Sequence, residues 1–241
     1  MNRFTKFLLI DFAVSAIDGN MRVSTTDLRR IAWNKLADNW SKVAVVMLLF
    51  MLISTAISGA CGAIGPGLSA VSSLLLLPMS YAFTVAMLRF VRGGEAPQVN
   101  DLFEIYKTNF SRAFLVQFLV GLFTFLWTLL LIIPGIIMGY AYSMSVYIAN
   151  DNPELSEMDA IKKSRELMNG HKLELFLLDI TFIGWIFLCI LSFGIGFLWI
   201  GPYIQAAHAE FYRVLIGDFD QEIIESNLND EYGDVTVVEE N

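Results

Sequence analysis

The 241-residue sequence is poor in the residues that build disulfides and metal sites, with two cysteines and two histidines. Cys61 and Cys189 give neither a disulfide framework nor a metal-ligand cluster, and we expect both to act as small apolar residues. The chain also lacks the His-Glu-x-x-His zinc helix, the glycine loop with lysine that binds phosphates, and the Gly-x-Ser-x-Gly nucleophile elbow. We therefore predict no catalytic residue, no metal, no cofactor and no enzymatic activity.

Charge is missing from four long stretches, which are residues 43–65, 67–88, 113–149 and 180–209. The hydrophobic fraction of 56%, the 19 phenylalanines and the mean hydropathy of +0.57 exceed what a soluble domain usually has. A membrane span needs roughly 20 apolar residues, and lipid forces every backbone group to bond within the chain. Because the apolar runs show no alternation of period two, we predict an all-α integral membrane protein.

Two apolar stretches are too long for single spans. Residues 113–149 would extend about 55 Å as a helix and 173–212 about 60 Å, against roughly 30 Å of hydrocarbon. We expect them to fold back at Pro134-Gly135 and at Ser192–Gly196, as Cys61–Gly67 does between the first two spans. Pro78, Pro134 and Pro202 are the expected hairpin and kink residues. The prediction is six transmembrane helices in three hairpins, at about 43–61, 67–88, 113–133, 135–150, 173–192 and 195–213.

The basic residues predict the topology. All 16 Lys and Arg side chains lie in Arg3–Lys42, in 89–112, in 162–172 or at Arg213, and the three hairpin tips have none. Since loops rich in Lys and Arg stay in the cytoplasm, both termini and the two longer loops are expected there. This arrangement requires an even number of spans.

The two ends of the chain differ from the membrane domain, which we place at residues 22–216. Residues 1–21 are read as an N-terminal extension, with Met21 as an alternative start. Residues 217–241 hold nine acidic residues and no basic one, so that the rest of the chain has a net charge of +1 rather than the overall -8. This acidic tail is expected to be flexible, and either solvates the protein or docks to a basic partner; nucleic acid is not an expected partner.

A similar tetrad precedes each predicted hairpin: Asn39-Trp40-Ser41-Lys42, Asn109-Phe110-Ser111-Arg112 and Asn169-Gly170-His171-Lys172. Ahead of each tetrad lies a polar segment with helical character, which we expect to be an interfacial helix on the cytoplasmic side. In the third segment, Ser156 and Asp159 resemble a capping box. The pattern predicts a threefold internal repeat of an interfacial helix and a hairpin. Short tetrads can also be similar by chance.

A set of polar residues is expected in the inner third of the membrane. By helical rise, Asp179 lies about 10 Å beyond Lys172 and His208 about 7.5 Å before Arg213, so these two side chains are able to meet. Ionisable groups in hydrocarbon suggest function, here a proton-linked site. The alternative is a structural role through snorkelling, ion pairing or hydrogen bonds between helices. The candidate layer consists of Asp179, His208, Gln117, Gln205 and Glu210.

Small residues recur at every fourth position after the middle turn, at Gly135, Gly139 and Ser143. Such ridges allow helix backbones to approach closely. We expect this one to serve packing within the monomer, with self-association as the alternative.

The second half of the chain resembles a known family. The run from IIPGIIMGYAYSMSVYIANDNPELSEMDAIKKSRELMNGHK to PYIQAAHAEFYR is similar to the bacterial membrane family called domain of unknown function 975. The resemblance covers roughly residues 22–213 and is weaker before residue 100. The matching residues are Pro134, Gly135, Tyr140, Pro153, Ala160, Ser164, Met168, Gly170, Gly194, Trp199, Pro202, Tyr203, Phe211 and Tyr212. The resemblance implies a multi-pass protein of the bacterial cytoplasmic membrane without an established activity. It also implies a relation to the membrane domains of some glycerophosphodiester phosphodiesterases, whose catalytic domain is not found in this sequence.

Two functions are therefore expected from the sequence. The first is a non-enzymatic membrane module that interacts with lipids, or with a membrane or cytoplasmic protein through its helices and acidic tail. The second is a small-solute or proton-linked transporter that uses the inner polar layer.

Overall fold

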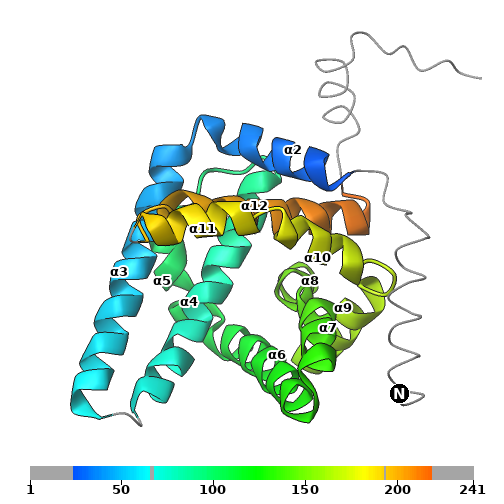
Figure 1. Cartoon of the computed structure of the whole chain (residues 1–241). Coiled ribbons are helices and arrows are strands. Elements are labelled where there is room, and N and C mark those ends of the chain that lie inside the picture. The colour runs from blue at the N-terminus through cyan, green and yellow to red at the C-terminus, as the bar shows by residue number, and fades with distance from the viewer. Residues whose placement is uncertain (1–23, 66–67, 193, 219–241) are drawn as a thin grey trace, which may run out of the picture.

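The computed structural model describes residues 24–65, 68–192 and 194–218, and every regular element in this part of the chain is a helix (Figure 1). The N-terminal extension 1–21 and the acidic tail beyond Asp218 lie outside the described residues.

Three short helices share the same N-terminal structure. They are α2 (Thr25–Ala37), α5 (Val99–Thr108) and α9 (Glu157–Leu167). Each has an aspartate at its third position that bonds back to the N-cap residue: Asp27 to Ser24, Asp101 to Gln98 and Asp159 to Ser156. Such boxes satisfy backbone N–H groups that have no partner within the helix. The sequence indicated this box only for Ser156.

Each short helix is followed by a pair of long helical segments that contact each other. The first pair is α3 (Trp40–Ile64) and α4 (Leu68–Val91), and the second is α6 (Phe110–Leu130) with α7 (Ile132–Tyr142), which continues into α8 (Ser145–Asp151). In the third pair α10 (Lys172–Ile180) and α11 (Ile183–Leu191) lead outward and α12 (Phe197–Ile216) returns. Below, α4, α7 with α8, and α12 are called the return helices.

The turn of the middle pair lies earlier than predicted. The break falls at Leu131, whose backbone is extended, and not at Pro134-Gly135. Pro134 is instead the third residue of α7, where its missing N–H group would have no partner in any case. Pro78 and Pro202 lie inside α4 and α12. Gly194 has a φ of 87° at the turn before α12, within the predicted segment Ser192–Gly196.

The short helices connect the pairs in a ring. α5 packs on the return helix α4 of the pair before it, and α9 packs on α7 and α8. α2, which has no pair before it among the described residues, packs on the return helix α12 of the last pair. The N-terminal and C-terminal parts of the described chain therefore meet, although about 170 residues separate Arg29 from Tyr203, whose hydroxyl donates to the Arg29 carbonyl.

The buried core lies where the return helices meet. The segment Ser145–Ala149 of α8 is buried throughout. Most core residues come from α2, α4, α8 and α12, with fewer from α3, α5, α6, α9, α10 and α11. Away from this centre the three pairs point in different directions in Figure 1. α3/α4 run down the left side of the view, α11/α12 run across it, and α6/α7 end at its lower edge. Their far ends are apolar and exposed, as Ile64 (73%), Leu129 (74%) and Leu191 (73%) show.

Five helical segments of the described chain are long and apolar enough to cross a membrane, namely Trp40–Ile64, Ser72–Val91, Phe110–Leu130, Ile132–Asp151 and Lys172–Leu191. The predicted sixth span, α12, has 20 residues but is not among them. It contains Gln205, His208, Glu210 and Arg213, and most of its residues from Pro202 to Arg213 are buried.

The small-residue ridge has one tight contact. A Cβ atom on Gly135 would lie 2.2 Å from the Thr128 Oγ1 atom and 2.6 Å from the Thr128 Cα atom, so α6 and α7 touch where a side chain would not fit. A Cβ atom on Gly139 would meet only Thr124 Cγ2 at 3.5 Å, an ordinary contact. Ser143 donates to the carbonyl of Tyr140.

We predict that Gly135→Ala destabilises the protein by about 1–3 kcal/mol, because backbone atoms of Thr128 must move. Thermal unfolding of the detergent-purified protein measures this effect. Gly139→Ala is the matched control and should leave the melting temperature unchanged or slightly raised, since alanine favours helices. Equal effects of the two substitutions would contradict the assigned contact.

Candidate functional site

Four helix ends converge on a cluster of charged side chains, which we call the charged junction. Its members come from α2, from α8, from α12 and from the residue after α4, and they are Lys35, Arg92, Asp151, Glu210 and Arg213. Arg213 and Glu210 are among the few charged residues buried in the described chain. Because isolated buried charges are very costly, the partners of each group determine whether this junction is stable.

Glu210 lies at the centre of the junction and is fully buried. Its Oε1 atom is 2.7 Å from Lys35 Nζ, and its Oε2 atom is 3.1 Å from Arg213 Nη1. Both cations also donate to the carbonyl oxygen of Val91, the last residue of α4. Since the C-terminal end of a helix has unpaired carbonyls and partial negative charge, this is a favourable place for two cations.

Arg92 forms the second half of the junction. Its guanidinium group makes a bidentate pair with Asp151 at 2.6 and 2.8 Å, and its Nε atom donates to Asp218 at 2.8 Å. The hydrogen bonds to Asp151 are the largest cause of a raised Arg92 pKa, with the Asp218 carboxylate adding to it. Tyr212 donates to Asp151 Oδ2 at 2.9 Å, and its ring stacks on Tyr147. Arg92 thereby links the ends of α4, α8 and α12.

Arg112, near the start of α6, holds the end of α8 through hydrogen bonds to backbone carbonyl groups. Its guanidinium donates to the carbonyl oxygens of Ala149, Asn152, Pro153 and Leu155 at 2.8–3.2 Å. These carbonyls follow the last turn of α8 and lack partners within that helix. Arg112 therefore acts as a side-chain cap for the segment that leads into α9.

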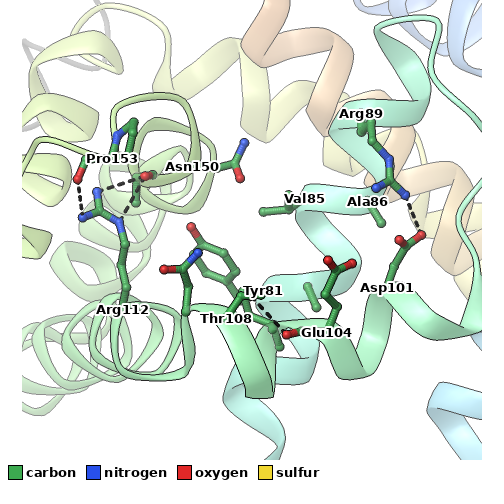
Figure 2. A pocket seen from close by; sticks show the side chains of 14 residues that line it. Tyr81, Val85, Ala86, Arg89, Asp101, Glu104, Thr108, Arg112, Asn150 and Pro153 are labelled. Carbon is green, nitrogen blue, oxygen red and sulfur yellow. Dashed lines mark hydrogen bonds and ion pairs between the residues drawn. The ribbon is translucent and has the colours of Figure 1, made fainter.

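A cavity of about 290 Å³ lies beside the junction, between α4, α5, α6 and α8 (Figure 2). Arg89 and Arg112 line opposite sides of it. Arg89 is paired with Asp101 at 2.6 Å, and Arg112 is bound to the carbonyls named above. Glu104 and Tyr81 complete its polar wall. With two cations and two carboxylates, the wall is electrically balanced.

The structure divides the five residues of the predicted polar layer among three environments, since the α4 partners of Gln205 and Gln117 are joined by a hydrogen bond from the Thr84 hydroxyl to the Ser80 carbonyl. Asp179 and His208 do meet: Asp179 Oδ1 is 2.6 Å from His208 Nε2, and Tyr140 donates to Asp179 Oδ2 at 2.9 Å. Gln205 donates to Thr84 at 2.8 Å, and Gln117 donates to Ser80 at 3.1 Å. Glu210 belongs to the charged junction. The layer is thus a set of local bonds between helices and not one continuous site.

Sequence reasoning did not identify most of the junction. Lys35 was placed only in a polar helical segment and Arg92 only in a basic loop, Asp151 was not singled out, and Tyr140 and Tyr212 were named only as family matches. A signal was available for Arg92 and Asp151, because each lies within four residues of the end of a long uncharged run and so near the end of a helix. What the sequence could not give is the pairing, which joins residues 59 positions apart.

The fold and the site define an all-helical protein with several helices apolar enough for a membrane, joined at a buried ionic centre. The family model described as protein of unknown function DUF975 matches residues 21–138 and 128–218. The chain therefore belongs to this family, as the resemblance indicated. Neither a curated protein nor a solved structure matches the chain. The relation to membrane domains of glycerophosphodiester phosphodiesterases stays a prediction.

Among the described residues, no group of three or more His, Cys, Asp or Glu side chains is placed to hold a metal ion. The arrangement of the junction is suited to holding helices together, because each charge faces an opposite charge or a carbonyl oxygen.

We predict that Glu210→Gln lowers the free energy of unfolding by about 3–5 kcal/mol, because the partly exposed Lys35 and the buried Arg213 would both lose their nearest carboxylate, and Arg213 would keep the more distant Asp218 at 3.8 Å. Thermal or denaturant unfolding in detergent measures the loss. Glu154→Gln, which removes an exposed carboxylate in the loop after α8, should change stability by no more than about 0.5 kcal/mol. A Glu210 variant as stable as the Glu154 variant would show that the junction is not a stabilising element.

Proposed function

We propose that this protein is a non-enzymatic, multi-pass module of the bacterial cytoplasmic membrane that interacts with lipids or with a partner protein. The observation that supports the proposal is the division of the molecule into a buried ionic centre and three divergent pairs with exposed apolar ends. Exposed apolar surfaces of this size are unfavourable in water and favourable in acyl chains. In this proposal each of the three pairs is a transmembrane hairpin, which gives six spans with α12 as the sixth.

The aspartate boxes of the short helices favour a threefold repeat of an interfacial helix and a hairpin. The ring of contacts also favours a repeat, because α5 and α9 each pack on the return helix of the pair before them and α2 packs on the return helix of the last pair. In such an arrangement the short helices and the junction lie at the cytoplasmic surface, where their charges meet water and lipid headgroups. Both termini then lie in the cytoplasm, and the acidic tail is available to a protein partner.

The cysteine content offers a direct test of this topology. Cys61 lies near the far end of α3, and Cys189 is the other cysteine of the chain. In the variant Cys189→Ser, a membrane-impermeant thiol reagent added to intact spheroplasts should label Cys61. In the variant Cys61→Ser, Cys189→Ser, Glu154→Cys, labelling should require permeabilised membranes, because residue 154 lies in a loop on the cytoplasmic side. The reverse pattern would contradict the proposed topology.

A second candidate function is proton-linked transport, and one observation favours it. The Tyr140–Asp179–His208 group lies between α7, α10 and α12, and the Asp179 and His208 side chains are 31% and 23% exposed. Each group has a hydrogen-bond partner, however, and neither Asp179 nor His208 lines the cavity beside the charged junction. The structural role is therefore the one we favour.

We expect liposomes with the wild-type protein to show no proton flux above that of empty liposomes, measured with an entrapped pH-sensitive dye. Asp179→Asn should weaken the bonds to Tyr140 and His208 and lower stability by about 1–3 kcal/mol. A wild-type flux that Asp179→Asn abolishes, with Glu154→Gln as the unaffected control, would establish the transporter in place of the module.

A further inference from the structure

A groove of about 520 Å³ lies between α6, α7 and α9. One wall is apolar and aromatic, formed by Phe123 and Trp127 of α6 and by Tyr142 of α7. The opposite wall is α9, which contributes Met158, Ile161, Lys162 and Arg165, together with Asp159. The groove thus combines an apolar floor with a charged rim.

The charges at the rim leave an excess of one positive charge. Asp159 is engaged in the N-terminal box of α9, where its Oδ2 atom is 2.6 Å from Ser156 Oγ. Lys162 and Arg165 are exposed, lie three positions apart on one helix face, and have no ion pair among the described residues. Two adjacent cations of this kind can bind the two free oxygens of a phosphodiester.

The position of α9 is fixed by packing rather than by these charges. Ile161 packs with Val120 and Phe123 of α6, and the buried Ser164 hydroxyl donates to the Ala141 carbonyl of α7 at 2.9 Å. Lys163, the neighbour of Lys162, points elsewhere and donates to Asn152 at 2.9 Å. The two rim cations are therefore held over the groove by a helix that has its own anchor.

The apolar wall continues out of the groove along α6. Leu126 and Leu130 follow Phe123 and Trp127 on the same side of the helix, by their spacing of three and four residues, and are 50% and 66% exposed. An acyl chain that starts in the groove therefore finds apolar surface for about 5 Å beyond Trp127. A soluble phosphate compound would leave that surface unused.

We propose that the groove binds an anionic phospholipid of the cytoplasmic leaflet, with its phosphate between Lys162 and Arg165 and an acyl chain along Phe123, Trp127 and Leu130. This inference rests on the proposed membrane location. It places the phosphate at the level of Phe123 and Trp127, roughly 6–12 Å along α6 from the turn at Leu131, so in this inference the α6/α7 pair enters the cytoplasmic leaflet without crossing it, in place of the third and fourth proposed spans.

The test uses the full chain, purified in detergent, and native mass spectrometry to count bound phosphatidylglycerol as its concentration is raised. Lys162→Gln with Arg165→Gln should weaken binding roughly thirtyfold and each single variant roughly fivefold. Lys163→Gln removes the same charge from the same helix outside the groove and should bind as the wild type does. The single variants also serve as the test if the double variant does not fold.

Two further ligands identify the source of the phosphate. Phosphatidylcholine, which has no net charge, should bind at least tenfold more weakly than phosphatidylglycerol, and glycerol 3-phosphate should not bind in the same range. The inference would be overturned if the double variant bound phosphatidylglycerol as tightly as the wild type. It would also be overturned if Lys163→Gln weakened this binding as much as Lys162→Gln or Arg165→Gln, or if glycerol 3-phosphate bound tightly. Fractionation of the cells that produce the protein separates the two proposals. If the protein is found in the membrane fraction but the rim substitutions leave phosphatidylglycerol binding unchanged, the lipid site is contradicted and the membrane location is not.

Discussion

The buried carboxylate of Glu210 is the constraint on which the rest of the structure depends. It holds Lys35 of α2 and Arg213 of α12 at the carbonyl end of α4, and so closes the ring of helices between the two ends of the described chain. A buried ion pair adds little stability compared with an apolar core, but its geometry admits few alternatives. The junction therefore specifies which helix ends meet, while apolar packing supplies most of the stabilisation.

The junction also explains how one chain can combine a polar centre with apolar arms. Several charged side chains near the helix ends form ion pairs with one another or hydrogen bonds with carbonyl groups. Examples are the Arg92–Asp151 pair and the Arg112 cap. What is left exposed on the outer halves of the pairs is almost entirely aliphatic and aromatic. Exposed charges without an ion pair among the described residues remain on the short helices, including Lys107 and the two rim cations Lys162 and Arg165.

Local features could be read from the sequence, and long-range ones could not. Uncharged runs predicted helices that end near Ile64, Leu191 and Ile216, because a helix boundary depends on neighbouring residues. The middle turn was misplaced because a proline is tolerated in the first turn of a helix. Their depths alone indicated that Asp179 and His208 are able to meet, and in the structure they do. Gln117, Gln205 and Glu210 were grouped with them by depth, but their directions around the helix axis lead them to different partners. The packing of α9 on α6 and α7 depends on tertiary contacts that no local pattern contains.

The central claim is that acyl chains surround the far ends of the helix pairs and not the junction. Quenching of tryptophan fluorescence by phospholipids with brominated acyl chains tests it in reconstituted variants that retain one tryptophan. Trp185 of α11 and Trp33 of α2 are matched probes, since their side chains are 44% and 47% exposed. The account predicts strong quenching of Trp185 and weak quenching of Trp33. Equal quenching of the two, or none for Trp185, would contradict it.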